Sequence, residues 1–183
     1  RRSSDLNDPE FHELLVRWFE YGCFCPVMRL HGYRWPLQPQ YGTTGGATCV
    51  SGAPNEVWSY TDQVCEILSD YLRLRERMLP YITELMEEAH EKGTPVMRPL
   101  FYDFPEDKES WNVETEYMFG PKVLVKPITD ADARETDVYL PGAGSWTNAW
   151  TGETFEGGQK VHVAAPIEQI PLFTRDGYKL PMK

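Results

Sequence analysis

The chain has 183 residues and a mass of 21.2 kDa, enough for one ordinary domain or one and a half. Its 18 basic and 28 acidic side chains give a net charge of −10 at pH 7. Such an acidic surface repels phosphate backbones and anionic headgroups, so neither nucleic acid nor a membrane is expected as a partner. The start, without Met and without the apolar centre of a signal peptide, is typical of an interior stretch of a longer chain.

The N-terminal segment predicts a helix that begins at Asp8-Pro9, because Asp caps free amides and Pro is favoured at the first helical position. Its apolar residues recur with the helical period and predict one stripe, made of Phe11, Leu14, Leu15, Trp18 and Phe19. Gly22 should end this helix. Residues 24–30 are mostly apolar and favour a strand buried on both faces, which would end at residues 31–32.

The middle of the chain predicts a long loop and a second helix. Residues 33–61 show no period and are rich in Gly, Pro, Ser and Thr, as in a functional loop. A helical pattern then runs from a cap at Asp62 to residue 92, where Gly93 should end it. Pro80 is expected to kink this helix, because it deletes one backbone hydrogen bond and crowds the preceding turn.

From Thr94 onward the apolar period changes to two and turn residues multiply. The expected strands cover residues 96–102, 117–128, 136–140, 146–150, 160–164 and 169–174. Short strands at this spacing favour an antiparallel β-sandwich.

The residues available for chemistry are few. His12, His90 and His162 follow the patterns of ordinary surface residues. His31 stands where the buried strand meets the Gly-rich loop, a place where α/β sheets and barrels put ligand contacts, with packing inside a loop as the alternative. Carboxylates lie on helix faces and in turns, and there is no nucleophile elbow or phosphate loop. Taken by itself, the chain is therefore not expected to be a complete enzyme.

The cysteines and aromatic residues give weaker indications. Cysteines at positions 23, 25, 49 and 65 fit neither a disulfide framework nor zinc-ligand spacing, so all four are expected to be buried or free thiols. Neither a metal nor a cofactor is expected. Aromatic side chains make up 13% of the chain, which suits either sugar binding or a large aromatic core.

Taken in order, several segments resemble a known family. They are residues 15–22, 24–32, 56–60, 71–75, 78–81 and 93–100, followed by 117–121, 138–141, 146–147 and 170–173. Together they resemble glycoside hydrolase family 31, the retaining α-glycosidases that include α-glucosidases and α-xylosidases. Family members carry a (β/α)₈ barrel followed by β-sandwich domains, and a barrel alone needs about 250 residues.

The resemblance implies an α+β fragment, with the last β/α elements of a (β/α)₈ barrel in residues 1–93 and the proximal β-sandwich in residues 94–183. Both catalytic aspartates of the family would lie upstream, so no catalytic residue is expected here. The R-x-H motif at Arg29-Leu30-His31 implies that His31 binds sugar hydroxyls in the −1 subsite. A neutral imidazole can both donate and accept a hydrogen bond, which suits neighbouring hydroxyls.

Three further residues are candidate parts of the cleft. Arg29 is expected to support carboxylates of the cleft. Trp35 and Trp58 could wall its mouth, with loop packing as the equal alternative.

The implied function is that of the C-terminal portion of a retaining exo-α-glycosidase, which hydrolyses terminal α-xylosyl residues of oligosaccharides by double displacement. An α-glucosidase of the same family is the first alternative. A non-catalytic carbohydrate-binding or docking sandwich is the second, although Trp146 and Trp150 are expected to be buried. Exposed apolar surface and an unpaired strand edge also make a homo-oligomer possible. The compartment and the leaving-group sugar stay open.

Overall fold

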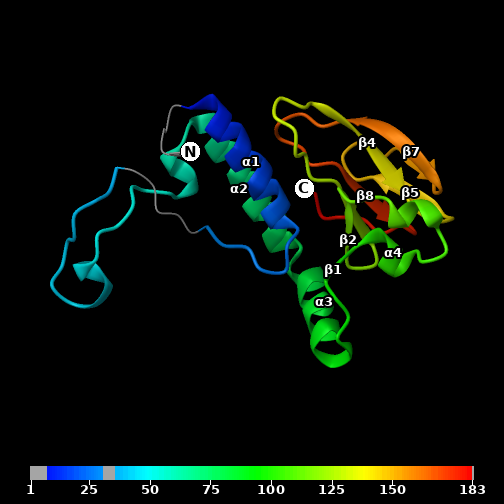
Figure 1. Ribbon diagram of the computed structural model, residues 1–183, viewed down its shortest axis with the longest axis horizontal. Helices are drawn as coiled ribbons and strands as arrows, with labels where there is room; N and C mark the ends of the chain where they lie inside the picture. Colours follow the sequence, from blue (N-terminus) through cyan, green and yellow to red (C-terminus); the bar gives the residue numbers. More distant parts are fainter. Residues whose placement is uncertain (1–7, 31–35, 183) are drawn as a thin grey trace.

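The computed structural model describes residues 8–30 and 36–182, and it forms three layers (Figure 1). Three helices make the first layer: α1 (Pro9–Cys23), α2 (Asp62–Arg77) and α3 (Leu79–Lys92). A six-stranded sheet forms the middle layer and a two-stranded sheet the third. Helices α1 and α2 lie side by side and run in the same direction (Figure 1). Parallel neighbours need a crossover between them, which residues 24–61 supply. No helix within the described residues is long and apolar enough to cross a bilayer.

Helix α1 begins as expected but buries a different face. The Asp8 side chain accepts a hydrogen bond from Glu10 N at 3.0 Å, and the helix ends at Cys23, one residue beyond Gly22. The expected apolar stripe is wrong in part, because Leu14 is 52% and Trp18 65% exposed. The buried residues are instead Val16, Arg17, Phe19, Glu20 and Cys23. Two charged side chains can share this face because other groups satisfy them, as described below.

The expected strand at residues 24–30 is wrong. A turn and bends follow α1, and Val27 is 77% exposed. A strand is stable only when neighbouring strands bind its backbone groups, and no strand of the described residues pairs with this segment. We call residues 24–30 the exit segment.

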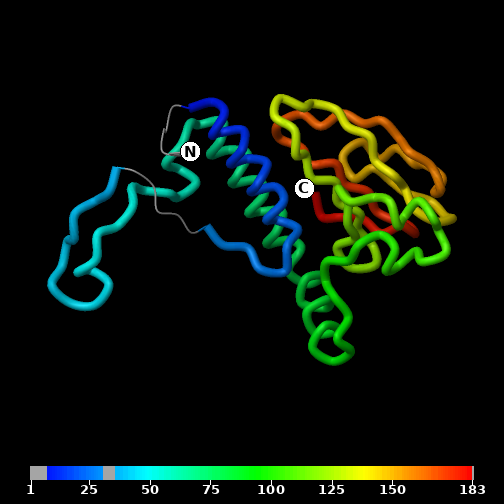
Figure 2. Tube along the Cα trace, viewed as in Figure 1, coloured from blue at the N-terminus to red at the C-terminus, as the bar shows by residue number. Residues whose placement is uncertain are grey.

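The loop that follows extends away from the body of the protein, as the cyan part of Figure 2 shows. Its only ladder contact within the described residues is the bridge between Gln38 and Ser51. Two short 3₁₀ helices, Gly45–Thr48 (η1) and Val57–Ser59 (η2), interrupt it. The absence of a sequence period correctly indicated a long loop here.

The second helical pattern is divided at Met78 into α2 and α3. Pro80 lies in the first turn of α3, where its missing N–H costs nothing, so the expected kink is a complete break. The cap was misplaced by one residue, because the Thr61 hydroxyl, and not Asp62, accepts from Val64 N at 3.3 Å. Gly93 ends α3 at φ 71°, as expected.

Residues beyond 93 form the two antiparallel sheets. The strands are β1 (Met97–Arg98), β2 (Tyr117–Phe119), β3 (Val123–Val125), β4 (Glu135–Leu140), β5 (Ser145–Asn148), β6 (Thr154–Glu156), β7 (Gln159–Ala164) and β8 (Leu172–Arg175). The larger sheet has the order β1-β2-β3-β8-β5-β6, and β4 pairs with β7. The antiparallel sandwich is therefore confirmed.

Several strand boundaries differ from expectation. The expected strand at 96–102 is cut short by a helical turn, α4 (Leu100–Asp103), and the one at 117–128 is the hairpin of β2 and β3. A further 3₁₀ helix, η3 (Lys108–Trp111), precedes β2. Strand β5 ends before residue 150, and β6 was not anticipated.

The middle sheet is buried on both faces. On β3, Val123 and Val125 pack toward the helices while Leu124 points into the space between the sheets. On β8, Leu172 and Phe173 divide in the same way. This explains the nearly continuous apolar runs of these strands. One core therefore joins α1, α2 and α3 to the larger sheet.

Candidate functional site

Two side chains from other elements bind the backbone carbonyl groups where the exit segment leaves α1. Arg75 of α2 donates from Nη1 to the carbonyl oxygens of Cys23 at 2.7 Å and Cys25 at 2.8 Å, and from Nη2 to that of Pro26 at 3.0 Å. The Tyr117 hydroxyl donates to the Phe24 carbonyl oxygen at 3.0 Å. The segment therefore starts from a fixed position.

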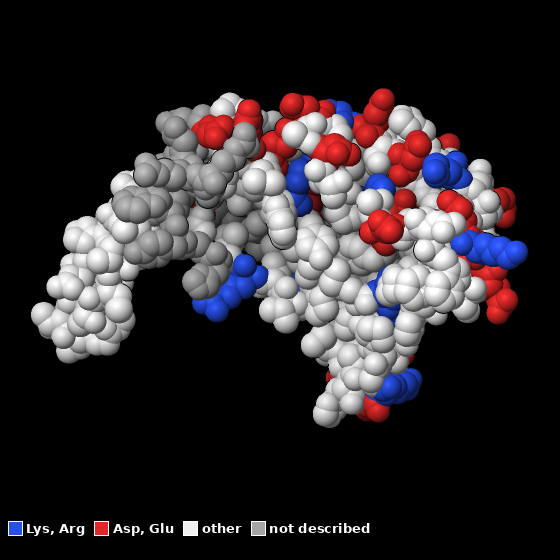
Figure 3. All heavy atoms as spheres, in the orientation of Figure 1, with Lys and Arg blue, Asp and Glu red and all other residues white. Residues whose placement is uncertain are grey.

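Beyond this anchor, the exit segment meets the long loop at a groove of about 790 Å³, which we call the loop groove. Its described lining residues are Arg29, Leu30, Gln38, Pro39, Tyr41, Ser51, Gly52, Ala53, Pro54, Asn55 and Glu56. Residues 36–55 carry no charged side chain, and this part of the surface is uniformly white in Figure 3. The groove thus presents amides, hydroxyls and a tyrosine ring, together with two charged residues, Arg29 and Glu56.

The four sequence-predicted site residues have different outcomes. His31 and Trp35 lie outside the described residues. Arg29 is exposed at the wall of the loop groove. Trp58 lies on η2 and is 72% exposed, but it does not line that groove. Within the described residues, no group of three His, Cys, Asp or Glu side chains could hold a metal ion.

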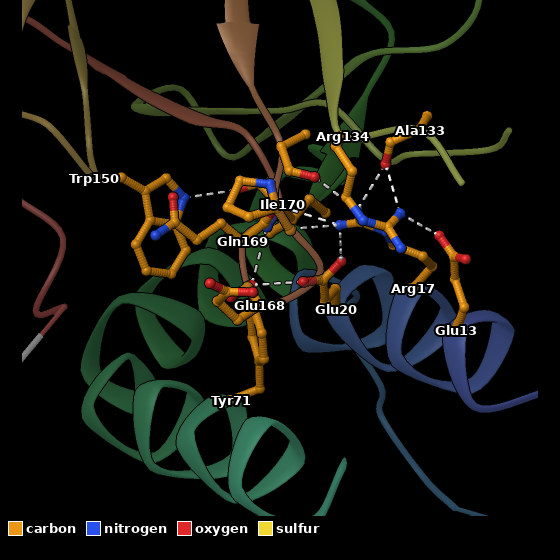
Figure 4. A network of polar contacts seen from close by, with 12 residues as sticks. Glu13, Arg17, Glu20, Tyr71, Ala133, Arg134, Trp150, Glu168, Gln169 and Ile170 are labelled. Atoms are coloured by element: carbon orange, nitrogen blue, oxygen red, sulfur yellow. Dashed lines mark hydrogen bonds and ion pairs between the residues drawn. The ribbon is translucent and has the colours of Figure 1, made fainter. Parts of the chain in front are cut away.

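A buried polar network lies where the helices meet the sandwich (Figure 4). Arg17 of α1 donates to the carbonyl oxygens of four residues in the loops of the sandwich and to the carboxylate of Glu20 at 3.0 Å. The carbonyls belong to Ala133 at 3.2 Å, Ala165 at 2.7 Å, Pro166 at 3.2 Å and Gln169 at 3.3 Å. We call Arg17, Glu20, Tyr71 and these carbonyls the Arg17 network.

Tyr71 closes this network from α2. Its hydroxyl lies 3.0 Å from Glu20 Oε1 and 3.1 Å from the Glu168 carbonyl oxygen, and it accepts from Ile170 N at 3.0 Å. Burial raises the pKa of Glu20, while Arg17 and Tyr71 oppose that rise. The same burial raises the pKa of Tyr71 well above its usual value.

A second buried carboxylate lies in the sandwich. Glu116 accepts from Tyr139 N at 3.1 Å on both oxygens and faces Lys126 Nζ at 3.6 Å. Burial raises its pKa to about 7, against the opposing effects of the Tyr139 amide and Lys126. Because Glu116 and Glu20 both have their oxygens bound by protein groups, they hold the fold together and offer no free acid or base.

The cysteines are free thiols, as expected. Burial raises the pKa of Cys23 to about 12, and Cys49 is exposed on the loop. The nearby Arg75 opposes this rise, but burial outweighs it, so Cys23 is not an activated thiolate nucleophile.

Sequence reasoning missed Arg17, Glu20, Tyr71 and Arg75 as functional positions. The available signal was a pair of opposite charges at i and i+3 directly beside buried apolar positions on α1. Charged helix residues are usually exposed, so this pattern reads as an ordinary polar face.

Known proteins share both parts of this arrangement. Residues 5–85 match the glycosyl hydrolases family 31 TIM-barrel domain, and residues 93–180 match the glycosyl hydrolase family 31 C-terminal domain. A family 31 α-xylosidase from a soil metagenome, solved in complex with xylose, is 46% identical with a TM-score of 0.89. That match covers 97% of this chain and 26% of the other.

Curated relatives agree with this likeness. The α-xylosidase of Saccharolobus solfataricus is 36% identical over 94% of this chain and 21% of its own length. Alpha-glucosidase 2 of Bacillus thermoamyloliquefaciens is 36% identical over 90% of this chain and 19% of its own length. The chain thus spans about a fifth of the length of these relatives.

The parallel helix pair, the sandwich packed against it and these matches define the end of a glycoside hydrolase barrel with its C-terminal domain. The chain belongs to glycosyl hydrolase family 31.

Proposed function

We propose that this chain is the barrel-end and sandwich portion of a retaining exo-α-glycosidase that removes terminal α-xylosyl residues from oligosaccharides. The observation that carries the proposal is the 46% identity to an α-xylosidase along 97% of the chain, at a TM-score of 0.89. The α-xylosidase of Aspergillus niger adds to it, with 37% identity over 93% of the chain. In this proposal, residues 1–93 belong to the barrel and residues 94–183 to the proximal sandwich.

The chemistry of the loop groove supports a neutral, hydroxyl-rich ligand, because its two charged lining residues, Arg29 and Glu56, have opposite signs. Its described lining offers the Gln38 and Asn55 amides and the Tyr41 and Ser51 hydroxyls, which can bind sugar hydroxyls by exchanging donor and acceptor roles. Arg29 stands at its wall and would support the carboxylates of the cleft, while His31 would bind hydroxyls of the terminal sugar. The nucleophile and the acid/base would come from the rest of the enzyme, and double displacement would retain the anomeric configuration.

An α-glucosidase of the same family is the alternative specificity, because relatives of both kinds match at equal identity. Hydrolysis of aryl α-xylosides and aryl α-glucosides separates the two, measured for the 183-residue chain at high concentration and for the full-length enzyme. A full-length kcat/KM that favours the xyloside, with an inactive chain, supports the proposal. A preference for the glucoside would contradict it, and turnover by the chain alone would place the catalytic pair within these residues.

A carbohydrate-binding sandwich finds less support. Trp146 is buried beneath the sandwich surface, and Trp150 is half-buried with its indole N–H donating to the Ile170 carbonyl oxygen at 2.7 Å. These two residues also do not share a strand, because β5 ends at Asn148. They therefore do not form an exposed aromatic row for a sugar chain.

Self-association is a separate proposal about partners. A second groove of about 900 Å³ runs between α1 and the sandwich, and its exposed apolar lining includes Trp18, Phe101 and Trp111. Sedimentation velocity at several concentrations tests it, and a single monomeric species at all of them would contradict it.

A further inference from the structure

The C-terminal end of α1 lacks a feature that helix ends ordinarily use. The last carbonyl groups of a helix have no intrahelical partner and carry partial negative charge, so basic residues are favoured in the last turn. Helix α1 has none there. Arg75, a residue of the neighbouring helix α2, supplies the missing cation and donates to the carbonyl oxygens of Cys23, Cys25 and Pro26.

Side chains from outside bind four consecutive carbonyls at this point, because Tyr117 takes that of Phe24. The segment's own backbone bonds at this point are those from the N–H groups of Phe24 and Cys25 to α1. No strand of the described residues pairs with the exit segment. The position of the segment therefore depends on Arg75, which makes three of these four contacts.

We infer that Arg75 is a positioning residue that fixes the exit segment and, through it, the sugar-binding end of the cleft. Arg29 lies three residues beyond the last carbonyl that Arg75 binds, and Met28, directly before it, packs against the helical core. This inference rests on the proposed function, which gives residues 29 and 31 their roles toward the sugar. Arg75 itself does not touch substrate.

The chemistry of the contact requires a guanidinium. Two guanidinium nitrogens of Arg75 donate hydrogen bonds to three carbonyl oxygens at 2.7–3.0 Å. A lysine ammonium is instead a compact point charge on a flexible stem. Arg75→Lys should therefore retain only part of the effect, and Arg75→Met should lose it while keeping apolar volume.

The same helix provides a matched control. Arg77 lies two residues further along α2 and also binds backbone carbonyls, those of Pro181 and Met182 at 2.7 Å each. Arg77→Met removes the same kind of contact from the same helix but at the C-terminal tail. A general effect of losing a cation from α2 would appear in both variants.

The test has one readout in the 183-residue chain and one in the full-length enzyme. Hydrogen exchange followed by mass spectrometry, well below the melting temperature, should show the hydrogen-bonded amides of Phe24 and Cys25 exchanging about tenfold faster in Arg75→Met, with smaller acceleration in Arg75→Lys. The exchange rates of peptides from α3 and the sandwich should not change. In the enzyme, KM for an aryl α-xyloside should rise about tenfold in Arg75→Met and hardly change in Arg77→Met.

Each outcome has a defined meaning. Local acceleration together with the rise in KM supports the inference. Unchanged exchange at Phe24 and Cys25, equal acceleration in every peptide, or acceleration without a change in KM would overturn it. A wild-type enzyme inactive on every α-glycoside would remove the proposed function and the link to sugar, while the exchange data would still decide whether Arg75 fixes the segment.

Discussion

Nη2 of Arg17 lies 2.7 Å from the carbonyl oxygen of Ala165, a residue 148 positions further along the chain. This contact crosses from helix α1 to the sandwich, and three further carbonyls from the sandwich loops share the same guanidinium. A single buried cation thus fastens the two parts together, within a core that is continuous across the proposed domain boundary. The sandwich is therefore a structural support for the helices that flank the exit segment.

Arg17→Met should destabilise the chain by about 3–5 kcal/mol, because it leaves the buried Glu20 carboxylate without its cation. Urea unfolding followed by tryptophan fluorescence measures the loss. Arg73→Met is the matched control, since Arg73 pairs with Asp70 on the exposed face of α2 and such pairs contribute about 0–1 kcal/mol. Equal losses in the two variants would show that the Arg17 network does not hold the parts together.

Glu116 should make the chain less stable as pH rises from about 4.5 to about 7. Its pKa is about 7 in the folded chain and 4.5 as the reference for the unfolded chain, so the folded state binds more protons in this window. The stabilisation is complete below the unfolded pKa and is lost as pH passes the folded one. The expected loss in the free energy of unfolding across this window is about 3 kcal/mol, at about 1.4 kcal/mol per pKa unit.

Glu116→Gln tests this pH dependence, because the amide oxygen can still accept from Tyr139 N but no longer titrates. Thermal melting between pH 4.5 and 8 should show a smaller decline in the variant than in the parent chain. The raised pKa of Glu20 also lowers stability as pH rises, so the melting temperature of the variant should still fall somewhat with pH. Glu106→Gln, at an exposed position, serves as the control, and the same slope in both variants would contradict the assignment to Glu116.

Gly120→Ala should cost more stability than Gly93→Ala, although both residues have positive φ, 61° and 71°. A Cβ at Gly120 would collide with the Tyr81 hydroxyl and lie 2.5 Å from Leu85 Cδ2, whereas one at Gly93 would meet open space. Backbone strain alone costs about 1–2 kcal/mol, and the collision should add about 1–3 kcal/mol. Chemical denaturation of both variants isolates the second contribution, and equal losses would mean that α3 moves aside.

The sequence pattern correctly predicted those elements that nearby residues alone determine. Gly93 marked the end of α3, and the absence of period marked the loop. Pro80 indicated a kink where the structure has a complete break. The long alternation near residues 117–128 indicated strands, but not that Gly120 would fold them into a hairpin. Strand β6 is short and has Phe155 as its single apolar residue, so it showed no period.

The errors arose where distant residues decide the outcome. The buried face of α1 includes Arg17 and Glu20 because sandwich carbonyls and Tyr71 satisfy them, and no periodicity of α1 reports those partners. The apolar residues 24–30 read as a strand, but strand formation depends on neighbours. Of the candidate site, the sequence indicated Arg29 beside the loop, yet the anchor at Arg75 could be found only in three dimensions.

His31→Ala in the full-length enzyme should lower kcat/KM for the aryl α-xyloside by about 30- to 1,000-fold, equivalent to about 2–4 kcal/mol of transition-state stabilisation. The reason is the proposed role of the imidazole, which binds sugar hydroxyls in the −1 subsite. The loss should appear in kcat as well as in KM, since a preorganised hydrogen bond near the reacting carbon strengthens in the transition state. His90→Ala, at an exposed position on α3, should leave both constants unchanged. An unchanged kcat/KM in His31→Ala would remove this residue from the site, and it would also remove the reason for expecting the exit segment to guide a sugar.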